Sequence, residues 1–400
     1  MKRIFLDHAA TTPLEKEVKK VMDIYATKHF GNPGSLHKEG VTGREAILAA
    51  RFSAAQFLGA LPEEIIFTAG GTEANNIAIL GVFEELFHSG VSLRECHAIT
   101  SVIEHPSVLV VFQALERKGL SVTYVSVNDG GAVSAKEIRE SLRENTKLVS
   151  IMHANNETGT KEPITEITKA VRHFKGKSGN MYPLVHTDAC QTLMLSSQTV
   201  RALGVDMLSA SAQKVYGPKG VGMLYVKKGT PIAPIMYGGG QERGLRPGTE
   251  HVAGIAGFAR ALSITEKLRE KECLRLGRLR AYFLARLETF FPECVINGDT
   301  KEQMPHIVNV SFPGFDQEEL VLRLDAKGVA IAARSACGER DEDVSYVIQA
   351  LGPGHYPESA VRFSMGRSTG RQDIDHILRA LKEIFNSITK NNHDIRNKKL

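Results

Sequence analysis

The sequence predicts an α/β protein with a large domain built on a parallel sheet, with helices on both faces, and a smaller α+β domain. Three observations predict this arrangement. The chain has 400 residues, which is more than one hydrophobic core usually serves. Short apolar runs alternate with longer helical patterns through residues 45–260, as in parallel sheets. Strand-like segments and a terminal helix follow residue 290 and indicate a second domain.

The elements of this fold are predicted in chain order. Strand-length apolar runs lie at 64–67, 97–100, 122–127, 147–152 and 184–186. A long helical pattern with charges on one side covers 257–290 and can bridge the two domains. The smaller domain takes strands at 307–312 and 328–332 and a helix near 373–388. The extended N-terminal segment joins one of the two domains, and its pattern does not decide which.

The composition excludes several classes of protein. Hydrophobic residues make up 42% and charged residues 24%, as in ordinary globular chains. No apolar stretch approaches the ~20 residues of a membrane helix, and no signal-peptide core precedes Asp7. The formal net charge of +5 is too small and too dispersed to indicate a nucleic-acid surface. The basic segment 390–399 is interpreted as a solvated tail, with partner docking as the alternative.

The cysteines indicate a reducing compartment. There are five, and none forms a C-x-x-C pair, so neither a disulfide framework nor a cysteine metal site is expected. We therefore expect a cytoplasmic protein without a metal centre.

Three short motifs could carry chemistry. Residues 68–75 (TAGGTEAN) follow a strand and open a helix, so the glycines and free N–H groups suit an anion, although on this motif alone a plain turn capped by Thr72 is the more frequent explanation. Asp188 ends a buried strand, where α/β sheets place ligands, or it is a solvated strand-end carboxylate. Lys214 lies among small residues and suits a covalent Schiff base, or it is an exposed loop lysine, as Lys219 beside it is interpreted to be.

Together these motifs match the needs of one cofactor. Pyridoxal 5'-phosphate requires a phosphate cradle, an acid beside its pyridine nitrogen and a lysine that binds its aldehyde. Each motif alone is weak, but their order on an α/β pattern is much less frequent by chance.

The chain then resembles the pyridoxal-phosphate-dependent cysteine desulfurases that serve iron–sulfur cluster assembly, within the class V aminotransferase group. The resemblance covers nearly the whole chain. It rests on the ordered motifs FLDHAATTP (5–13), FGNPGS (30–35), GGTEANN (70–76), EH (104–105), MHANNETG (152–159), HTDACQ (186–191), SAQKVYGPKG (211–220), GGGQERGLRPGT (238–249), SAC (335–337) and VRFSMGR (361–367).

The resemblance implies fold type I of the pyridoxal-phosphate enzymes, with a mostly parallel seven-stranded sheet sandwiched by helices. It implies a large domain over 15–258, a small domain made of 1–14 and 259–388, and a basic tail over 389–400. It also implies a homodimer and a sulfur-acceptor protein, with no direct binding of nucleic acid or membrane.

The resemblance also assigns roles to individual residues. Lys214 would bind the cofactor covalently, and His105 would stack on its ring and assist proton transfer. Cofactor contacts would come from Gly71, Thr72, Asn155, Asp188, Gln191, Ser211, Gln213 and, from the neighbouring subunit, Thr249. Arg362 would bind the substrate carboxylate through its planar fork, assisted by Asn32. Gln213 stands where the family usually has His, and its amide can still donate to a phosphate.

Cys337 aligns with the cysteine that forms a persulfide in the family. It lies in a polar segment, ARSACGERDED (333–343), where Arg334 and Arg340 favour the thiolate and the following acids oppose it. The predicted function is desulfuration of L-cysteine to L-alanine, with sulfur delivered for iron–sulfur cluster assembly or tRNA thiolation. The alternatives are a selenocysteine lyase or an aminotransferase of the same fold, or a catalytically impaired partner in sulfur trafficking.

Overall fold

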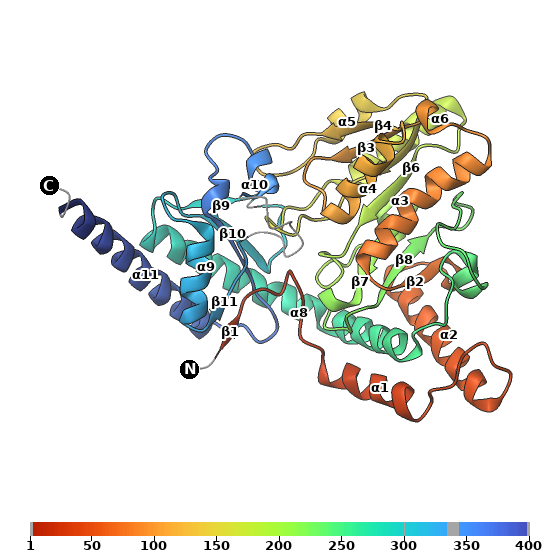
Figure 1. Cartoon of the computed structure of the whole chain (residues 1–400), viewed down its shortest axis with the longest axis horizontal. Helices are drawn as coiled ribbons and strands as arrows, with labels where there is room; N and C mark the ends of the chain where they lie inside the picture. The colour runs from red at the N-terminus through yellow and green to blue at the C-terminus, as the bar shows by residue number, and fades with distance from the viewer. Residues whose placement is uncertain (1–2, 300, 334–343, 398–400) are drawn as a thin grey trace.

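The fold is described here from a computed structural model, which describes residues 3–299, 301–333 and 344–397, with backbone alone for 177–178 and 388–397. Figure 1 shows a large lobe and a small lobe joined by one long helix, with the N-terminal strand in the small lobe. None of the helices in these ranges combines the length and the apolar character that crossing a bilayer requires.

The large lobe is built on a sheet that has seven strands in the described part of the chain, in the order β2-β8-β7-β6-β5-β3-β4. The pairs from β7 to β4 are parallel, and β8 is antiparallel to both β7 and β2. The prediction of a mostly parallel sheet is confirmed. Its strands are β2 (Ile65–Thr68), β3 (His97–Ser101), β4 (Ser121–Val125), β5 (Thr146–Ser150), β6 (Leu184–Asp188), β7 (Met207–Ser211) and β8 (Gly222–Val226).

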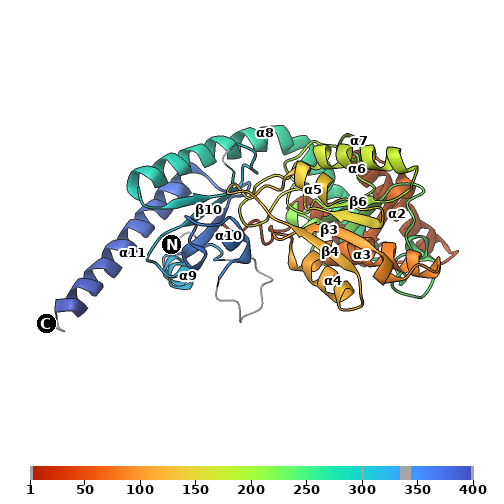
Figure 2. The same ribbon diagram turned by 90° about the horizontal axis from the view of Figure 1, so that it is seen from above.

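Helices cover both faces of this sheet (Figure 2). On one face lie α3 (Gly71–His88) and α4 (Pro106–Glu116), and they share a core with the strands, because both helices are rich in buried aliphatic and aromatic side chains. On the other face lie α6 (Ile164–Ser178) and α7 (Val200–Leu203), and α5 (Ala135–Ser141) packs against α6. The N-terminal helices α1 (Lys16–Thr27) and α2 (Lys38–Leu58) pack against α8.

The long helix α8 (Val252–Phe290) connects the lobes. Its first turns bury Val252, Ile255 and Phe258 against the large lobe, and its last turns bury Phe283 and Leu287 in the small lobe. Most residues of the segment between them are half-buried or exposed, and many of them are charged. Because its buried apolar residues cluster towards its two ends, the helix predicted at 257–290 packs into the cores of both lobes. The domain boundary predicted at 258–259 falls within it and stays a prediction.

The small lobe holds a three-stranded antiparallel sheet in the order β12-β10-β9 and a parallel pair formed by β1 and β11, within the described ranges. The strands are β1 (Ile4–Phe5), β9 (Val295–Asn297), β10 (Ile307–Ser311), β11 (Val329–Ala330) and β12 (Ala360–Ser364), and the helices are α9 (Gln317–Ala326), α10 (Tyr346–Ala350) and α11 (Arg371–Asn397). The terminal helix is longer than predicted, because α11 continues through most of the basic segment 389–400 and projects from the lobe (Figure 1).

The N-terminal segment contacts both lobes. Ile4 and Phe5 pair with β11 of the small lobe. A few residues later, Thr12 N–H donates to the carbonyl of Gln213, next to β7 of the large lobe. Residues 6–11 therefore cross the junction between the lobes. The sequence pattern had left open which of the two domains the N-terminal segment joins.

Candidate active site

A cavity of about 130 Å³ lies where β6 and β7 end, beside the first turn of α3 and the N-terminal segment. Parallel strands end at the same edge of a sheet, which is where α/β folds place ligands. The predicted site residues that line it are Gly71, Thr72, His105, Asp188, Gln191, Ser211, Gln213, Lys214 and Arg362. Residues far apart in the sequence therefore form one site.

Asp188, at the end of β6, is held as a fixed anion at the cavity wall. Its Oδ1 accepts the N–H of Cys190 at 2.9 Å, and its Oδ2 accepts Nδ2 of Asn75 at 2.7 Å. Its side chain is nearly buried and lines the cavity. Such a carboxylate can stabilise a protonated ring nitrogen in a ligand.

Lys214 brings an amine into the same cavity. It lies in the short turn Ala212–Lys214 that follows β7 directly. Its Nζ donates to the carbonyls of Ala9 and Ala10 at 2.6 and 2.7 Å. The side chain is thus turned inward, as expected for a lysine with a chemical role.

His105 presents a neutral imidazole. It is the residue before α4, and its Nδ1 accepts the N–H of Ser107 at 3.1 Å. Burial lowers the pKa of His105 below its ordinary value, while nearby Asp188 raises it by a smaller amount. Because Nδ1 accepts a backbone N–H, the proton of the neutral ring is on Nε2. His105 can therefore donate a hydrogen bond from Nε2.

The start of α3 and the end of β7 together suit an anion. The first N–H groups of a helix have no partner within the helix, and they favour a negative charge. Among the described residues, the hydroxyls of Thr72 and Ser211 make no hydrogen bond to protein, and Gln213 uses its Oε1 towards Thr11 and leaves its Nε2 free. These donors surround one wall of the cavity and fit a phosphate.

Arg362, on β12, brings a cation from the small lobe. Its side chain is 2% exposed and lines the cavity. Nη1 donates to the carbonyl of Asn156 at 2.8 Å and Nη2 to Asp7 Oδ1 at 2.7 Å. Without the family resemblance, Arg362 would be expected on the protein surface, as most arginines are. The structure instead places its guanidinium in the cavity wall.

Three predicted residues are not part of this wall, and a fourth lies outside the described residues. Asn155 is fully buried, and its Oδ1 accepts the N–H groups of Glu157 and Thr158, whereas the next residue, Asn156, lines the cavity. Asn32 and Thr249 are exposed and do not line the cavity. Cys337 lies outside the described residues.

The segment that carries Thr249 is nevertheless anchored. Glu242, within the glycine-rich residues 238–249, accepts both Nη groups of Arg51 at 2.6 and 2.8 Å and the N–H of Phe67 at 2.8 Å. This buried ion pair holds the segment against α2 and β2.

Sequence reasoning did not assign three residues of the site. Asn75 holds Asp188, Asp7 holds Arg362, and Asn156 supplies a carbonyl to Arg362. A signal existed for Asn75, since it follows Gly71 by one helical turn and faces the same side. The contact of Asp7 with Arg362 joins positions 355 residues apart, and no local pattern reports it.

The chain is similar to known proteins over nearly its whole length. The model of the family described as "Aminotransferase class-V" matches residues 4–377. The chain is 42% identical over 390 residues to the protein named cysteine desulfurase IscS of Dictyoglomus turgidum, covering 97% of this chain and 96% of that protein. It is 36% identical over 393 residues to the putative cysteine desulfurase IscS 1 of Bacillus subtilis, covering 97% and 100%.

Solved structures show the same fold. A NifS-like protein superimposes with a TM-score of 0.88 at 34% identity, covering 96% of this chain and 99% of that one. The structure of SspA in complex with cysteine gives a TM-score of 0.76 at 32% identity, covering 90% and 98%. The chain therefore belongs to the class-V aminotransferase family and, within it, to the cysteine desulfurases.

Proposed function

We propose that this chain converts L-cysteine to L-alanine and takes up the sulfur as a persulfide on Cys337. The observation that carries the proposal is the convergence of Lys214, Asp188, His105 and Arg362 on one cavity, in a chain whose relatives are named cysteine desulfurases. One related structure, SspA, is described in complex with cysteine, which supports the choice of substrate.

The cofactor that this cavity fits is pyridoxal 5'-phosphate. When bound, it supplies an aldehyde that takes the substrate amine and a ring that accepts electrons. Lys214 Nζ would hold it covalently, Asp188 would face its ring nitrogen, and the unused donors of Thr72, Ser211 and Gln213 would hold its phosphate. His105 lies on the same wall and would stack on the ring.

The residues of the chain then divide the work on the substrate. Arg362 binds the carboxylate and so orients the amino acid. The free amine of Lys214 would take up the Cα proton, and Asp188 would hold a proton on the ring nitrogen of a bound cofactor. The thiolate of Cys337 attacks the substrate sulfur: the new S–S bond forms as the Cβ–S bond breaks, and its electron pair stays on carbon, where a proton completes L-alanine. His105 is placed to donate from Nε2.

The assembly and the destination of the sulfur belong to the same proposal. Thr249 is exposed and lies away from the cavity of its own chain, which agrees with a contact to the phosphate of a neighbouring subunit in a homodimer. The sulfur acceptor would be a cluster scaffold or a tRNA-thiolation protein. This chemistry needs reduced cysteines, and thiols are kept reduced in the cytoplasm, so a cytoplasmic location is part of the proposal.

Replacing Cys337 tests the proposal. The cofactor-loaded protein is incubated with L-cysteine and a reductant, and alanine and sulfide are measured. We expect Cys337→Ala to reduce both by about a hundredfold or more, because the nucleophile is lost, and to leave the absorbance of the cofactor unchanged. Cys273 lines a different pocket and not this cavity, so Cys273→Ala serves as the matched control and should behave as the unmodified protein.

Other outcomes identify the alternatives. Unchanged turnover in Cys337→Ala refutes the persulfide role. Keto-acid-dependent amino transfer without release of sulfide indicates an aminotransferase, and preference for selenocysteine indicates a selenocysteine lyase. A loaded protein that releases no alanine from either substrate is a catalytically impaired partner.

A further inference from the structure

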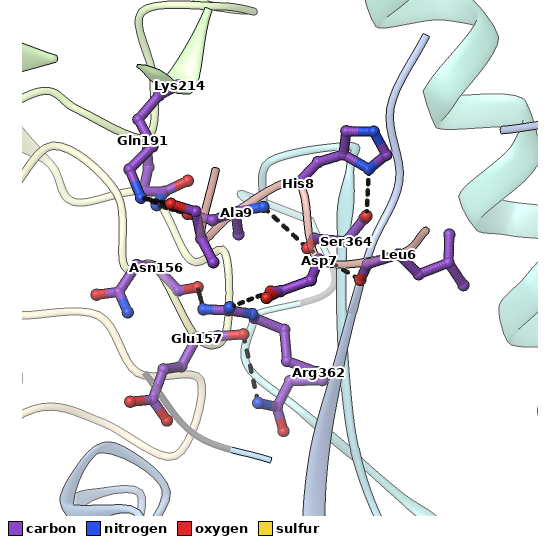
Figure 3. A network of polar contacts seen from close by, with 12 residues as sticks. Leu6, Asp7, His8, Ala9, Asn156, Glu157, Gln191, Lys214, Arg362 and Ser364 are labelled. Carbon is purple, nitrogen blue, oxygen red and sulfur yellow. Dashed lines mark hydrogen bonds and ion pairs between the residues drawn. The ribbon is translucent and has the colours of Figure 1, made fainter. Parts of the chain in front are cut away.

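The N-terminal segment Asp7–Ala10 contacts both cationic side chains of the cavity (Figure 3). Lys214, from the large lobe, donates to the carbonyls of Ala9 and Ala10 at 2.6 and 2.7 Å. Arg362, from the small lobe, donates to Asp7 Oδ1 at 2.7 Å. One short piece of chain therefore links the amine that would bind the cofactor to the guanidinium that would bind the substrate.

The backbone of this segment is fixed on both sides of Asp7. Ser364 N–H donates to the carbonyl of Leu6 at 2.7 Å, and the N–H of His8 donates to the carbonyl of Ser364 at 3.3 Å. The N–H of Ala9 donates to Ser364 Oγ at 2.9 Å, and Gln191 Nε2 donates to the carbonyl of Ala9 at 2.9 Å. Asp7 cannot leave Arg362 by a movement of the backbone without breaking this set of bonds.

The guanidinium keeps donors free for a ligand. Arginine has five N–H donors in a rigid plane. In Arg362, one N–H of Nη1 goes to Asn156 and one of Nη2 to Asp7, whereas Nε is buried and has no partner among the described residues. An arriving carboxylate can therefore bind Arg362 while Asp7 stays in place.

The buried charge also needs a partner before any ligand arrives. A buried cation without a counter-charge costs several kcal/mol, and it favours conformations that reach water. Arg362 is almost fully buried, whereas Asp7 is about one-fifth exposed, so the acid carries the smaller desolvation cost of the pair. The ion pair thus holds the fork in one orientation in the absence of substrate.

We propose that Asp7 is a positioning residue for the carboxylate site, and that Asp7–Ala10 sets the spacing between Arg362 and Lys214. This inference rests on the proposed function, because Arg362 is taken as the carboxylate-binding residue. The fixed spacing favours ligands that carry an amine and a carboxylate on the same carbon. Amines without a carboxylate use the Lys214 side of the cavity and gain nothing from Asp7.

Equilibrium binding tests the inference without turnover. The cofactor-loaded protein is titrated in a calorimeter with L-alanine, which has both groups, and with ethylamine, which lacks the carboxylate. Asp7→Ala should lower the affinity for L-alanine by about tenfold or more, which is the equivalent of one lost charge-assisted hydrogen bond. The affinity for ethylamine should not change. Asp7→Asn keeps an acceptor for Nη2 but loses the counter-charge, so it should weaken the binding of L-alanine less than Asp7→Ala does and more than no substitution.

Matched variants separate positioning from a general loss of structure. Asp325→Ala removes an exposed ion pair with Arg3, which also ties the N-terminal segment to the small lobe, and should not change the binding of L-alanine. If Asp7→Ala does not fold, Asp7→Glu keeps the charge but displaces the carboxylate by one methylene, and it should show the same selective loss for L-alanine.

Two results would overturn the inference. Asp7→Ala that binds L-alanine as tightly as the unmodified protein, or more tightly, would mean that Asp7 only competes for Arg362. Equal weakening of L-alanine and ethylamine would mean a purely structural role. Failure of the proposed function is distinguishable, since it shows as absence of alanine release from L-cysteine in the unmodified protein, whatever the binding data.

Discussion

Asn75 connects two sides of the cavity through one side chain. Its Nδ2 donates to Asp188 Oδ2 at 2.7 Å and to Ser107 Oγ at 2.8 Å, and Ser107 in turn contacts His105. Its Oδ1 is buried and has no partner among the described residues. Asn75 therefore fixes the direction of the Asp188 carboxylate and, through Ser107, the ring of His105.

We expect Asn75→Ala to weaken the binding of pyridoxal 5'-phosphate by about tenfold, because each lost hydrogen bond to a charged group is worth about 1.5 kcal/mol or more. The measurement is an absorbance titration of the cofactor-free protein. Asn76→Ala is the matched control: Asn76 is on the next position of α3, and its amide bonds to the carbonyl of Thr72 in the same helix. Equal affinities in the two variants would contradict the role of Asn75.

At the scale of elements, local patterns predicted most of the strands of the large sheet to within a few residues. They did not predict β7 and β8. The sequence of β7, MLSAS, is rich in small polar residues and lacks the aliphatic run of a buried strand. β8, GMLYV, does contain an apolar run, Met223–Val226, but it directly follows a glycine-rich turn and is not among the runs predicted above. Both are nevertheless fully buried, because burial is decided by the helices packed above them.

The site divides in the same way. Asp188 ends a predicted strand and Lys214 lies among small residues, so both could be predicted from local sequence, as could the glycines before α3. Nothing in the sequence pattern of β12 distinguishes Arg362 as a site residue, so it was predicted from the family resemblance. Its partner Asp7 is 355 positions away in the chain. Pairings of this kind depend on how the two lobes meet, which no local pattern contains.

The close approach of α3 to the end of β6 gives a prediction at this scale. A Cβ at Gly71 would lie 2.6 Å from Cys190 Sγ, which is shorter than a van der Waals contact. Gly71→Ala should therefore displace the first turn of α3 and weaken the binding of the cofactor by about 1–3 kcal/mol, as at other overpacked sites. Adding Cys190→Ala removes the sulfur and should restore most of the affinity. If Gly71→Ala and the double variant bind the cofactor equally well, the predicted clash is absent.

At the scale of the whole molecule, buried ionisable groups make stability depend on pH. Burial raises the pKa of Glu104 and of Glu162 to about 8. Burial also lowers the pKa of His97, His153 and His186 to about 4. Between pH 4.5 and 8 the two acids therefore keep their protons in the folded state, whereas in the unfolded state they lose them above the ordinary pKa near 4.5. The three histidines behave in the opposite way: in the unfolded state they bind protons below pH 6.5, and in the folded state they do not until about pH 4.

These two sets of groups act in opposite directions. As pH rises from 4.5 towards 8, the acids make the folded state progressively less stable, because the unfolded state binds fewer protons there. As pH falls from 6.5 towards 4, the histidines make it less stable, because the unfolded state binds more. Between pH 6.5 and 8 the histidines of the unfolded state lose their remaining protons, so their opposing effect fades and the two acids set the larger part of the slope.

We therefore expect the resistance of the protein to urea to decrease between pH 6.5 and pH 8, by up to about 1.4 kcal/mol per pH unit for each buried acid. Glu104→Gln should remove part of that slope. Glu104 is suited to this test because its Oε1 accepts from Ser101 Oγ at 2.7 Å and from the N–H of Met152 at 2.9 Å, and an amide oxygen can accept both bonds.

The control is Glu319→Gln, an exposed acid on α9 whose ion pair with Arg323 lies in solvent, and it should leave the slope unchanged. The urea midpoint is compared at the two pH values, with the same cofactor loading in every sample. A midpoint that stays constant or rises towards pH 8 in the unmodified protein would show that Glu104 and Glu162 are ionised in the fold. The core of the large lobe would then have to accommodate two buried negative charges.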